Sequence, residues 1–584
     1  MRNTSFTHRR RTRKRPSRLA TTLWYARVAV LAAVIIAAVV FAGFGARRFY
    51  NKLRSGGASH SVAAVTSAAH KQPALIVRQE LAHLRQQMQS LAKVVQGACQ
   101  QSGSVSGVSP WLEVQRTVED AVAQVFSHVT PFNWLEPYKA PSEGIASGSA
   151  FFINPDGDMI TNYHVVSQAR QVKIRLARMG QERLDVDIIG VCPDRDIALL
   201  RLAEEAKEKI IAKFGAVPYL KLGDSDTVGR TQEVMAVGYP LGRLSLKSTI
   251  GNISGWERFG NQSFIQLTSP INPGNSGGPT FNSRGEVVGV NTAAIPNAQN
   301  TGFFIPITEV RATLRDLYTT KLLRKPVLGG DFCIYTKHTR EWLGNPEGGG
   351  WLVMRVYPNT LLDRAGIQAG DVLYAVNGHE LDMYGDVEVS WATDSKVSVL
   401  DLLNRYMVGD VITIVAYRRG ERFERSLTLD DIFMLPIRKM YPDFEKITYE
   451  IFGGMIVMPL NINVINALLE RDSSLATYLT KYARPEHQYE EALIVTHIFP
   501  NSPVEDAKLV NAGAIIDEIN GQRVRSLDDF RAAVASGVGQ KFITMTTQFE
   551  RVLIVLSLDE IRKKEPILAS LYGYTPSLSF EAVK

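Results

Sequence analysis

Cysteine is scarce in this chain of 584 residues, which contains only Cys99, Cys192 and Cys333. None of the three forms a C-x-x-C pair, so a disulfide-stabilised scaffold and a cysteine-based zinc site are excluded, while a single disulfide stays open. The chain also lacks an extreme composition, since it is 45% hydrophobic and 21% charged. These values exclude a wholly disordered chain and a polytopic transporter. At roughly 150 residues per domain, the length predicts about four folding units.

Acidic residues are missing from the start of the chain. No Asp or Glu precedes Glu80, whereas residues 1–79 contain 15 Lys and Arg. Because the whole chain carries +8 and this tail carries +15, the remaining residues together carry −7. A nucleic-acid-binding domain needs a basic footprint of its own, so the mildly acidic body argues against nucleic acid as a partner.

One long hydrophobic run is present, from Val28 to Ala46, and it holds 19 residues without a charge. As a helix it would be about 28 Å long, enough to cross the core of a bilayer. Nine Lys or Arg precede the run and four follow it closely. The positive-inside rule then leaves residues 1–27 as a basic cytoplasmic tail and exports the rest of the chain. We predict a retained transmembrane signal anchor at 28–46.

Three other interpretations of the basic, hydrophobic start fit the sequence less well or remain alternatives. A cleaved signal peptide fits less well, because the run exceeds the usual 7–15 residues and ends without a clean small-x-small site. An Arg-rich, acid-free start is also typical of an organelle transit peptide. A buried core helix fits worst, because the run has no polar face.

Residues 47–110 have the composition of a linker that contains one helix. After a Ser/Ala/Gly-rich spacer at 55–73, apolar residues recur at alternating spacings of four and three: Val77, Leu81, Leu84, Met88, Leu91 and Val95. The pattern predicts a helix at about 75–97. It is either a short coiled coil, which would imply an oligomer, or an amphipathic helix packed on its own domain.

A serine among glycines supplies the first chemical signal: residues 271–279 are Ile-Asn-Pro-Gly-Asn-Ser-Gly-Gly-Pro. Glycine permits positive φ and a close approach of backbone N–H groups to a ligand. An acyl-transfer site needs such donors to stabilise an oxyanion. The candidate nucleophile is Ser276, and the candidate oxyanion-hole donors are the N–H groups of Gly274 and Ser276.

A nucleophilic serine needs a base and a group that orients the base. Of the ten histidines, only His164 lies in a strand–turn–strand setting just before small and β-branched residues. Asp196 lies at the mouth of an apolar strand, where a carboxylate needs a partner such as a histidine N–H. Asp187 and Asp194 are alternative third members. The order His164, Asp196, Ser276 is that of chymotrypsin-type enzymes.

The stretch 274–278 also fits G-x-S-x-G, the nucleophile elbow of α/β-hydrolases. That fold needs a helix after the serine and a histidine that comes last in the chain order. Here Gly277-Gly278-Pro279 opposes a helix, and the strand-like segment 286–290 follows. The elbow interpretation is therefore disfavoured.

Three segments together resemble one known family. Residues 161–166, 196–200 and 272–279 match the motifs TNxHVV, DxAxL and NPGNSGGP of the HtrA (Deg) serine proteases, and the resemblance covers about 110–560. It implies a mainly β protein, with a chymotrypsin-like double β-barrel followed by two α+β PDZ domains. It also implies a serine endopeptidase in which Ser276 attacks, His164 takes the proton and Asp196 holds the imidazole, without a metal or organic cofactor.

The resemblance also suggests a substrate pocket and shows two departures. Ile271, Ile295 and Thr301 align with the pocket of the family, and because none is charged, a small or medium aliphatic P1 residue is expected. Thr268-Ser269-Pro270 stands where the family usually has Asp-Ala-Ala, so the activation loop is expected to differ. Tyr163 replaces the common Asn before the histidine. Neither change removes a catalytic group.

Two later segments, 351–378 and 493–521, repeat an apolar strand followed by an Asn-Gly turn, and they resemble two PDZ domains. A PDZ domain adds a peptide as a strand and binds its C-terminal carboxylate through backbone N–H groups. The first candidate loop contains Leu328, Gly329 and Gly330, followed by Asp331, whose charge would repel a carboxylate. The second candidate loop begins at Phe452.

The second PDZ copy is enlarged by a helical insertion at roughly 463–490, as in the plant organellar branch of the family. We therefore expect the first PDZ to bind peptide and the second to be structural. The predicted domains are a basic tail 1–27, an anchor 28–46, a linker 47–110, a protease 111–323, PDZ1 324–432, and an extended PDZ2 with a C-terminal tail, 433–584.

The predicted protein is a membrane-anchored, ATP-independent endopeptidase of misfolded or regulatory extracytoplasmic proteins, whose PDZ domains bind C-terminal peptides. The alternative is a latent protease that acts as a PDZ scaffold or chaperone. The family resemblance implies a homo-oligomer, either a trimer or a multiple of it such as a hexamer. The simplest location is a cell (inner) membrane with the protease in the periplasm, and an organelle membrane remains the alternative.

Overall fold

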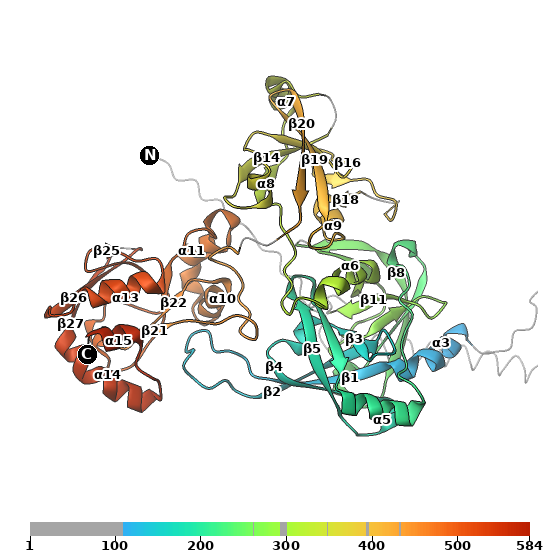
Figure 1. Cartoon of the computed structure of the whole chain (residues 1–584), viewed down its shortest axis with the longest axis horizontal. Coiled ribbons are helices and arrows are strands. Elements are labelled where there is room, and N and C mark those ends of the chain that lie inside the picture. The colour runs from blue at the N-terminus through green and yellow to red at the C-terminus, as the bar shows by residue number, and fades with distance from the viewer. Residues whose placement is uncertain are drawn as a thin grey trace, which may run out of the picture. The chain divides into compact units, whose positions relative to one another are not determined.

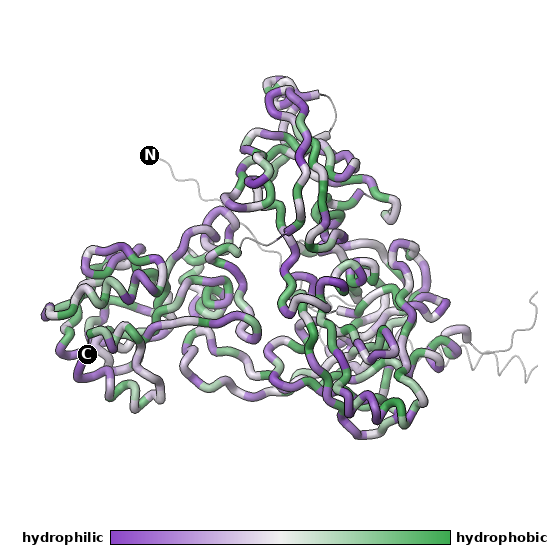
Figure 2. The backbone as a smooth tube through the Cα atoms, viewed as in Figure 1, coloured by the Kyte–Doolittle hydropathy of each residue, from purple (hydrophilic) through white to green (hydrophobic). Residues whose placement is uncertain are grey.

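The computed structural model describes residues 109–260, 262–292, 301–346, 349–392, 396–430, 434–549 and 551–583. The chain divides into two units, 1–106 and 107–584. The first unit, with the predicted anchor 28–46 and the predicted helix 75–97, lies outside the described residues. No helix in the described part of the chain has the length and apolarity to cross a membrane. In Figure 2, hydrophobic stretches of the described residues are interrupted by hydrophilic ones.

The first half of the protease region is a closed six-stranded barrel with the order β1-β2-β3-β6-β5-β4 (Figure 1). Pro110 starts the preceding helix, where its missing N–H costs no hydrogen bond. The elements are α3 (Pro110–Val118), η1 (Glu119–Ala121), β1 (Val122–Val129), β2 (Gly144–Phe152), β3 (Asp158–Thr161), α4 (Tyr163–Val166), β4 (Ala169–Arg175), η2 (Ala177–Met179), β5 (Leu184–Cys192), η3 (Pro193–Arg195) and β6 (Ile197–Leu202).

The second half is another closed barrel, with the order β10-β11-β12-β9-β8-β7. Its elements, with the helix that connects the barrels, are α5 (Glu204–Phe214), η4 (Ser225–Thr227), β7 (Glu233–Gly238), η5 (Pro240–Gly242), β8 (Lys247–Phe259), β9 (Gln262–Leu267), β10 (Pro279–Phe281), β11 (Val287–Thr292), β12 (Gly302–Pro306) and α6 (Ile307–Leu317). Side chains from both barrels, among them Phe151, Ile197, Tyr239 and Phe281, form one buried cluster. The predicted double β-barrel is confirmed.

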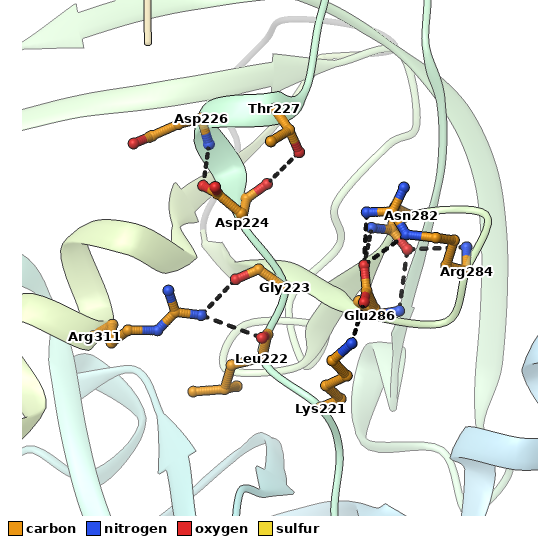
Figure 3. Close-up of polar contacts among 10 residues, drawn as sticks. All are labelled: Lys221, Leu222, Gly223, Asp224, Asp226, Thr227, Asn282, Arg284, Glu286 and Arg311. Carbon is orange, nitrogen blue, oxygen red and sulfur yellow. Dashed lines mark hydrogen bonds and ion pairs between the residues drawn. The ribbon is translucent and has the colours of Figure 1, made fainter. Parts of the chain in front are cut away.

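Polar contacts hold residues 221–227, which precede the second barrel, against α6 and the turn that follows β10 (Figure 3). Arg311 on α6 donates to the carbonyl oxygens of Leu222 (3.2 Å) and Gly223 (2.5 Å). Glu286 accepts from Lys221 at 2.7 Å, and this pairing, with Asn282 and Arg284, lowers the pKa of Glu286 to about 2. The same segment pairs with β11, because the N–H of Gly223 donates to the Val287 carbonyl and the N–H of Val287 donates to the Lys221 carbonyl. Arg311 satisfies the carbonyl groups of Leu222 and Gly223 that face away from this bridge.

The first PDZ region is built on a sheet with the order β13-β14-β15-β19-β20, in which β13 is an edge strand. Its elements are β13 (Gly330–Cys333), α7 (Lys337–Leu343), β14 (Trp351–Val356), α8 (Leu361–Arg364), β15 (Val372–Val376), β16 (His379–Glu380), β17 (Asp386–Val387), β18 (Val397–Ser398), α9 (Val399–Leu403), β19 (Val411–Arg418) and β20 (Glu421–Thr428). Cys333 on β13 and Cys192 on β5 are both free thiols.

The second PDZ region has the sheet order β21-β22-β23-β24-β26-β27. Its strands are β21 (Glu450–Phe452), β22 (Met455–Pro459), β23 (Leu493–Ile498), β24 (Ile515–Ile519), β25 (Gln522–Arg523), β26 (Phe542–Thr547) and β27 (Leu553–Ser557). Helical segments occupy 462–487, where the sequence predicts an insertion: α10 (Ile462–Arg471), η6 (Ser473–Leu475), α11 (Ala476–Leu479), η7 (Thr480–Ala483) and η8 (Pro485–His487). The other helices are α12 (Pro503–Ala507), α13 (Leu527–Ala535), α14 (Leu558–Tyr572) and α15 (Leu578–Val583).

Candidate active site

His164 lies on α4, a helix of only four residues that follows β3. Its neighbours Tyr163, Val165 and Val166 are buried at 8% exposure or less, whereas the His164 side chain is 46% exposed. The apolar neighbours anchor the helix in the first barrel, and they leave the imidazole facing solvent. A reactive imidazole on a rigid element is the arrangement that a general base requires.

Asp196 follows η3 in the left-handed conformation, with φ 51° and ψ 41°. Its carboxylate lies beside the imidazole, with Oδ2 2.8 Å and Oδ1 3.0 Å from Nδ1 of His164. Thr292 donates its hydroxyl to Oδ2 at 3.1 Å. Asp187 and Asp194 are exposed, and neither has a described bond to His164. The structure therefore brings Asp196, rather than either alternative, to the histidine.

The environment of His164 affects its protonation. The ring is only partly shielded from water, and this partial desolvation lowers its pKa, but the hydrogen bond to Asp196 and the charge of Asp196 together outweigh it, so the pKa of His164 is raised above its ordinary value. The same carboxylate fixes the tautomer, because Nδ1 must carry the proton to donate to it, which leaves Nε2 as the acceptor.

Ser276 lies in the glycine-rich turn between β9 and β10 and is 5% exposed. Its carbonyl accepts from the N–H of Ser149 on β2 at 2.8 Å. An added Cβ at Gly148 on the same strand would lie 3.2 Å from the Ser276 carbonyl oxygen and 2.6 Å from Val165. The serine turn and the histidine helix thus both contact β2 at Gly148 and Ser149. The described hydrogen bonds do not include one between Ser276 and His164, as is common before substrate binds.

The turn keeps the candidate oxyanion-hole donors free. Among the hydrogen bonds of the described residues, none is donated by the N–H of Gly274 or of Ser276. Gly274 has φ +99°, and the Pro273 carbonyl accepts from the N–H of Leu241 at 2.6 Å. Because a trans peptide points its C=O and N–H in opposite directions, the Gly274 N–H is directed away from Leu241. Both N–H groups thus lack an acceptor among the described hydrogen bonds.

The predicted substrate-pocket residues are only partly described. Ile271 is 5% exposed and belongs to the core of the second barrel. An added Cβ at Gly302 would lie 2.6 Å from it, so β12 packs tightly beside Ile271. Thr301 is half-buried directly before β12, and Ile295 lies outside the described residues.

Comparison with known proteins agrees with this geometry. The trypsin-like peptidase domain family matches residues 148–290, and PDZ domain families match 352–389 and 441–579. A "Probable periplasmic serine endoprotease DegP-like" from Bartonella henselae is 30% identical over 410 residues, which cover 69% of this chain and 72% of that protein. The chain belongs to the HtrA family of serine proteases.

A plant protein and a solved structure are also similar to this HtrA protease. "Protease Do-like 2, chloroplastic" from Arabidopsis thaliana is 31% identical over 422 residues, covering 69% of this chain and 65% of that protein. The similar proteins therefore include one from a plant. The solved structure of the HtrA-type protease AlgW with a decapeptide is 25% identical and covers 55% of this chain and 98% of its own, with a TM-score of 0.42.

The predicted peptide loop of PDZ1 borders a cavity of about 510 Å³. Its lining includes the loop residues Leu328, Gly329 and Gly330 and the α9 residues Leu400 and Leu403, and it also includes Asp194 and Arg195 of the protease region. Gly329 has φ +83°, and Gly330 begins the edge strand β13, whose outer side carries no other strand of the described sheet. A strand edge, a glycine loop and an apolar helix face are the parts that strand addition needs.

The corresponding parts of PDZ2 are occupied by the chain itself. Strand β21 pairs with β22, so it covers the edge that corresponds to the free edge of β13. Phe452 of β21 packs edge-to-face on Phe530 of α13, with 6.3 Å between ring centroids. Glu450 pairs with Arg531 of the same helix at 2.7 Å. An added peptide strand would have to displace β21.

Sequence reasoning missed the residues that support the site from distant segments. Thr292, which holds Asp196, comes from β11 of the other barrel. Arg195 donates to Asn404 in PDZ1, directly beside the candidate acid. In sequence Tyr163 is only a departure from the family motif, yet its ring contacts Tyr441 at the start of the PDZ2 region. None of these pairings leaves a local signal in the sequence.

Proposed function

We propose that this HtrA protease is a membrane-anchored, ATP-independent enzyme that cleaves misfolded or regulatory proteins outside the cytoplasm, using Ser276, His164 and Asp196. The observation that carries the proposal is the 2.8 Å contact between Asp196 and His164 Nδ1, beside a serine turn with unused N–H groups. Anchoring rests on the uncharged run 28–46 and its basic flanks. The periplasm is supported by relatives whose names include "periplasmic".

The proposed reaction uses the groups in the order that their geometry allows. Ser276 Oγ attacks the peptide carbonyl while His164 Nε2 takes its proton, and Asp196 stabilises the imidazolium that forms. The N–H groups of Gly274 and Ser276 bind the oxyanion of the tetrahedral intermediate. His164 then protonates the leaving amine, and water hydrolyses the acyl-enzyme by the same steps.

We further propose that PDZ1 binds C-terminal peptides of substrates or regulators, and that PDZ2 serves packing. The free edge of β13 supports the first role, and the edge covered by β21 supports the second. A homo-oligomer, either a trimer or a multiple of it, is proposed from the family resemblance. Its mass in detergent, measured by light scattering, would test that assignment.

The deciding experiment uses the full chain in detergent, with reduced casein as substrate and Ser276→Ala as the matched control. Wild type should cleave casein and react covalently with an organophosphonate at Ser276, whereas the variant should do neither. Addition of peptides with hydrophobic C-termini tests whether PDZ1 regulates cleavage. A folded wild type that neither cleaves nor reacts would favour the latent scaffold instead.

A further inference from the structure

The helix that carries His164 depends on its buried face for its position. α4 has only four residues, too few for a stable helix by itself. Tyr163, which directly precedes His164, is 8% exposed and packs in the core of the first barrel with Val165 and Val166. Whatever contacts this buried face therefore determines where the imidazole lies.

Part of that contact comes from outside the protease region. Tyr441, 4% exposed, belongs to the same buried cluster as Tyr163. The two rings meet edge-to-face, with centroids 5.7 Å apart and planes at 89°. This geometry is the favourable one for aromatic pairs. Phe444 packs on the same cluster. Both belong to the segment 438–445, which precedes β21 at the start of the PDZ2 region and which we name the linker clamp.

A second contact of the linker clamp fixes the backbone just after α4. The Asp443 carboxylate accepts from the N–H of Gln168 at 2.7 Å. Gln168 has φ +56°, an uncommon left-handed conformation for a non-glycine residue. Its carbonyl and side chain in turn accept from Thr130 (2.9 Å) and Phe132 (2.6 Å). Asp443 thus supports a strained residue only four positions from His164.

The linker clamp has a defined conformation of its own. The Glu445 carboxylate accepts from the Tyr441 N–H at 2.9 Å, from Arg438 at 2.7 Å and from Arg324 at 2.8 Å. The guanidinium of Arg324 also lies 5.0 Å from the centre of the Tyr441 ring. Charge-assisted bonds of this kind, with both partners mostly buried, hold a fixed geometry. Tyr441 is therefore presented to α4 by a rigid turn.

The same turn is also bonded to α10, the first inserted helix of PDZ2. Asn463 on α10 accepts from the Met440 N–H at 2.8 Å and donates to the Met440 carbonyl at 3.2 Å. The N–H of Ile462 donates to the carbonyl of Arg438 at 3.0 Å. Contacts therefore run without a gap from the inserted helix of PDZ2, through Met440 and Tyr441, to Tyr163 beside the candidate base.

We propose that the linker clamp positions His164 for catalysis, with Tyr441 and Asp443 as its two contact residues. This inference rests on the proposed catalytic role of His164. Neither residue touches the imidazole or Ser276, so both are positioning residues. Loss of these contacts lets α4 shift and moves the base away from the serine, and a displacement of about 1 Å in such a site can cost 100-fold in rate.

The test compares four variants of the full chain in detergent: Tyr441→Ala, Tyr441→Phe, Asp443→Ala and Phe549→Ala. Phe549 stacks on Tyr478 within PDZ2 and is the matched control for loss of an aromatic pair away from α4. The measured quantities are kcat and KM on a quenched peptide with valine at P1, and the rate of phosphonylation of Ser276. Thermal unfolding and circular dichroism confirm that each variant is folded at the assay temperature.

Tyr441→Ala and Asp443→Ala should lower kcat and the phosphonylation rate about tenfold while KM changes less than about twofold, because each removes one contact of the clamp with α4 or its flank. Tyr441→Phe should retain the wild-type values, because the described contacts of Tyr441 use its ring and backbone. Phe549→Ala should also retain them. The acid limb of the pH profile of kcat/KM should move to lower pH in the two impaired variants, because a looser Asp196 contact lowers the pKa of His164.

The charged groups around α4 are Asp196 on the side of the site, and Asp443 and Arg324 on the side of the clamp. A shift of the acid limb in Tyr441→Ala, which leaves all three in place, therefore reports a change of geometry. A folded Tyr441→Ala with wild-type kcat and acid limb would overturn the proposal, as would an equal loss in Phe549→Ala. A wild type that fails to react with the phosphonate would refute the proposed function itself.

Discussion

The carboxylate of Asp196 contacts His164 at two points. Oδ2 lies 2.8 Å from the ring Nδ1, and Oδ1 accepts from the backbone N–H of the same residue at 2.9 Å. One acid therefore fixes both the ring and the helix from which the ring projects. The hydroxyl of Thr292 holds that acid at 3.1 Å. The imidazole is thus oriented before substrate arrives, which limits reorganisation during proton transfer.

This contact predicts the pH dependence of catalysis. Because Asp196 raises the pKa of His164, the imidazole gives up its proton at a higher pH than an unperturbed histidine, whose pKa is about 6.5. A general base acts only when it is neutral, so kcat/KM should rise with pH through an apparent pKa above that value. The paired imidazolium stabilises the folded state below the ordinary pKa, and this stability is lost as pH rises through the raised value.

A pH series of kcat/KM on the peptide substrate measures the acid limb, and Thr292→Val provides the comparison. Loss of the hydroxyl should leave activity measurable but reduce it about three- to tenfold, since one donor to Asp196 is removed. An acid limb at or below the pH of an unperturbed histidine in the wild type would contradict the role given to Asp196.

The serine turn should not tolerate a side chain at Gly277. This residue has φ +84°, and an added Cβ would lie 2.1 Å from the Ser149 carbonyl oxygen and 2.3 Å from Thr161 Oγ1. Gly277→Ala must therefore displace the backbone beside Ser276 and should abolish measurable cleavage. Gly215→Ala is the matched control, because Gly215 has φ +85° with no atom within 4 Å of an added Cβ. Gly215→Ala should lower the free energy of unfolding by about 1 kcal/mol and should leave the cleavage activity unchanged.

The candidate site was predictable where the chemistry is local. Ser276 and Gly274 lie within one glycine-rich turn, and the neighbours of His164 and Asp196 follow family motifs, so short segments identified all of them. The pairing of Tyr163 with Tyr441 could not be foreseen, because it joins distant segments whose proximity depends on the packing of the whole chain. The β21–β22 hairpin was also missed, since Phe452-Gly453-Gly454 resembles an open peptide loop until β21 is seen to pair with β22.

Glu309 is another residue whose environment could not be foreseen from the sequence, and it provides a further prediction. In sequence it is an ordinary acidic residue in the first turn of a helix, yet it is 5% exposed, and burial raises its pKa to about 7 despite nearby Arg195 and Arg405. The folded state therefore binds its proton more tightly than the unfolded chain. This contribution to stability is complete below pH 4.5 and is lost as pH rises through about 7.

Glu309→Gln should remove that pH dependence. At pH 8 the variant should be more stable than wild type by on the order of 2 kcal/mol, and at pH 5 the two should be nearly equal. Urea unfolding at both values measures the difference. Glu204→Gln, at the exposed first turn of α5, is the control and should leave the pH dependence unchanged. A variant that is less stable than wild type at pH 8 would show that the ionised carboxylate is needed.

The charge of Asp331 should weaken, but not prevent, the proposed binding of peptides to PDZ1. Asp331 follows Gly330 on β13, next to the loop that would hold the terminal carboxylate. Its Oδ2 accepts from the Tyr357 hydroxyl at 2.7 Å and lies 4.0 Å from Arg355, which reduces its repulsion. Asp331→Asn should raise affinity about two- to fivefold, with a smaller gain at high salt.

Fluorescence anisotropy with a labelled peptide that has a hydrophobic, free C-terminus measures this affinity in the full chain. The same peptide with an amidated C-terminus should bind weakly, and Asp331→Asn should not change that value, because no carboxylate remains to be repelled. Glu424→Gln, an exposed acid on β20, controls for net charge and should have little effect. An equal gain for the amidated peptide would show that Asp331 acts on the conformation of the loop rather than on the carboxylate. Weaker binding in Asp331→Asn would show that its bond from Tyr357 is needed to order β13 for strand addition.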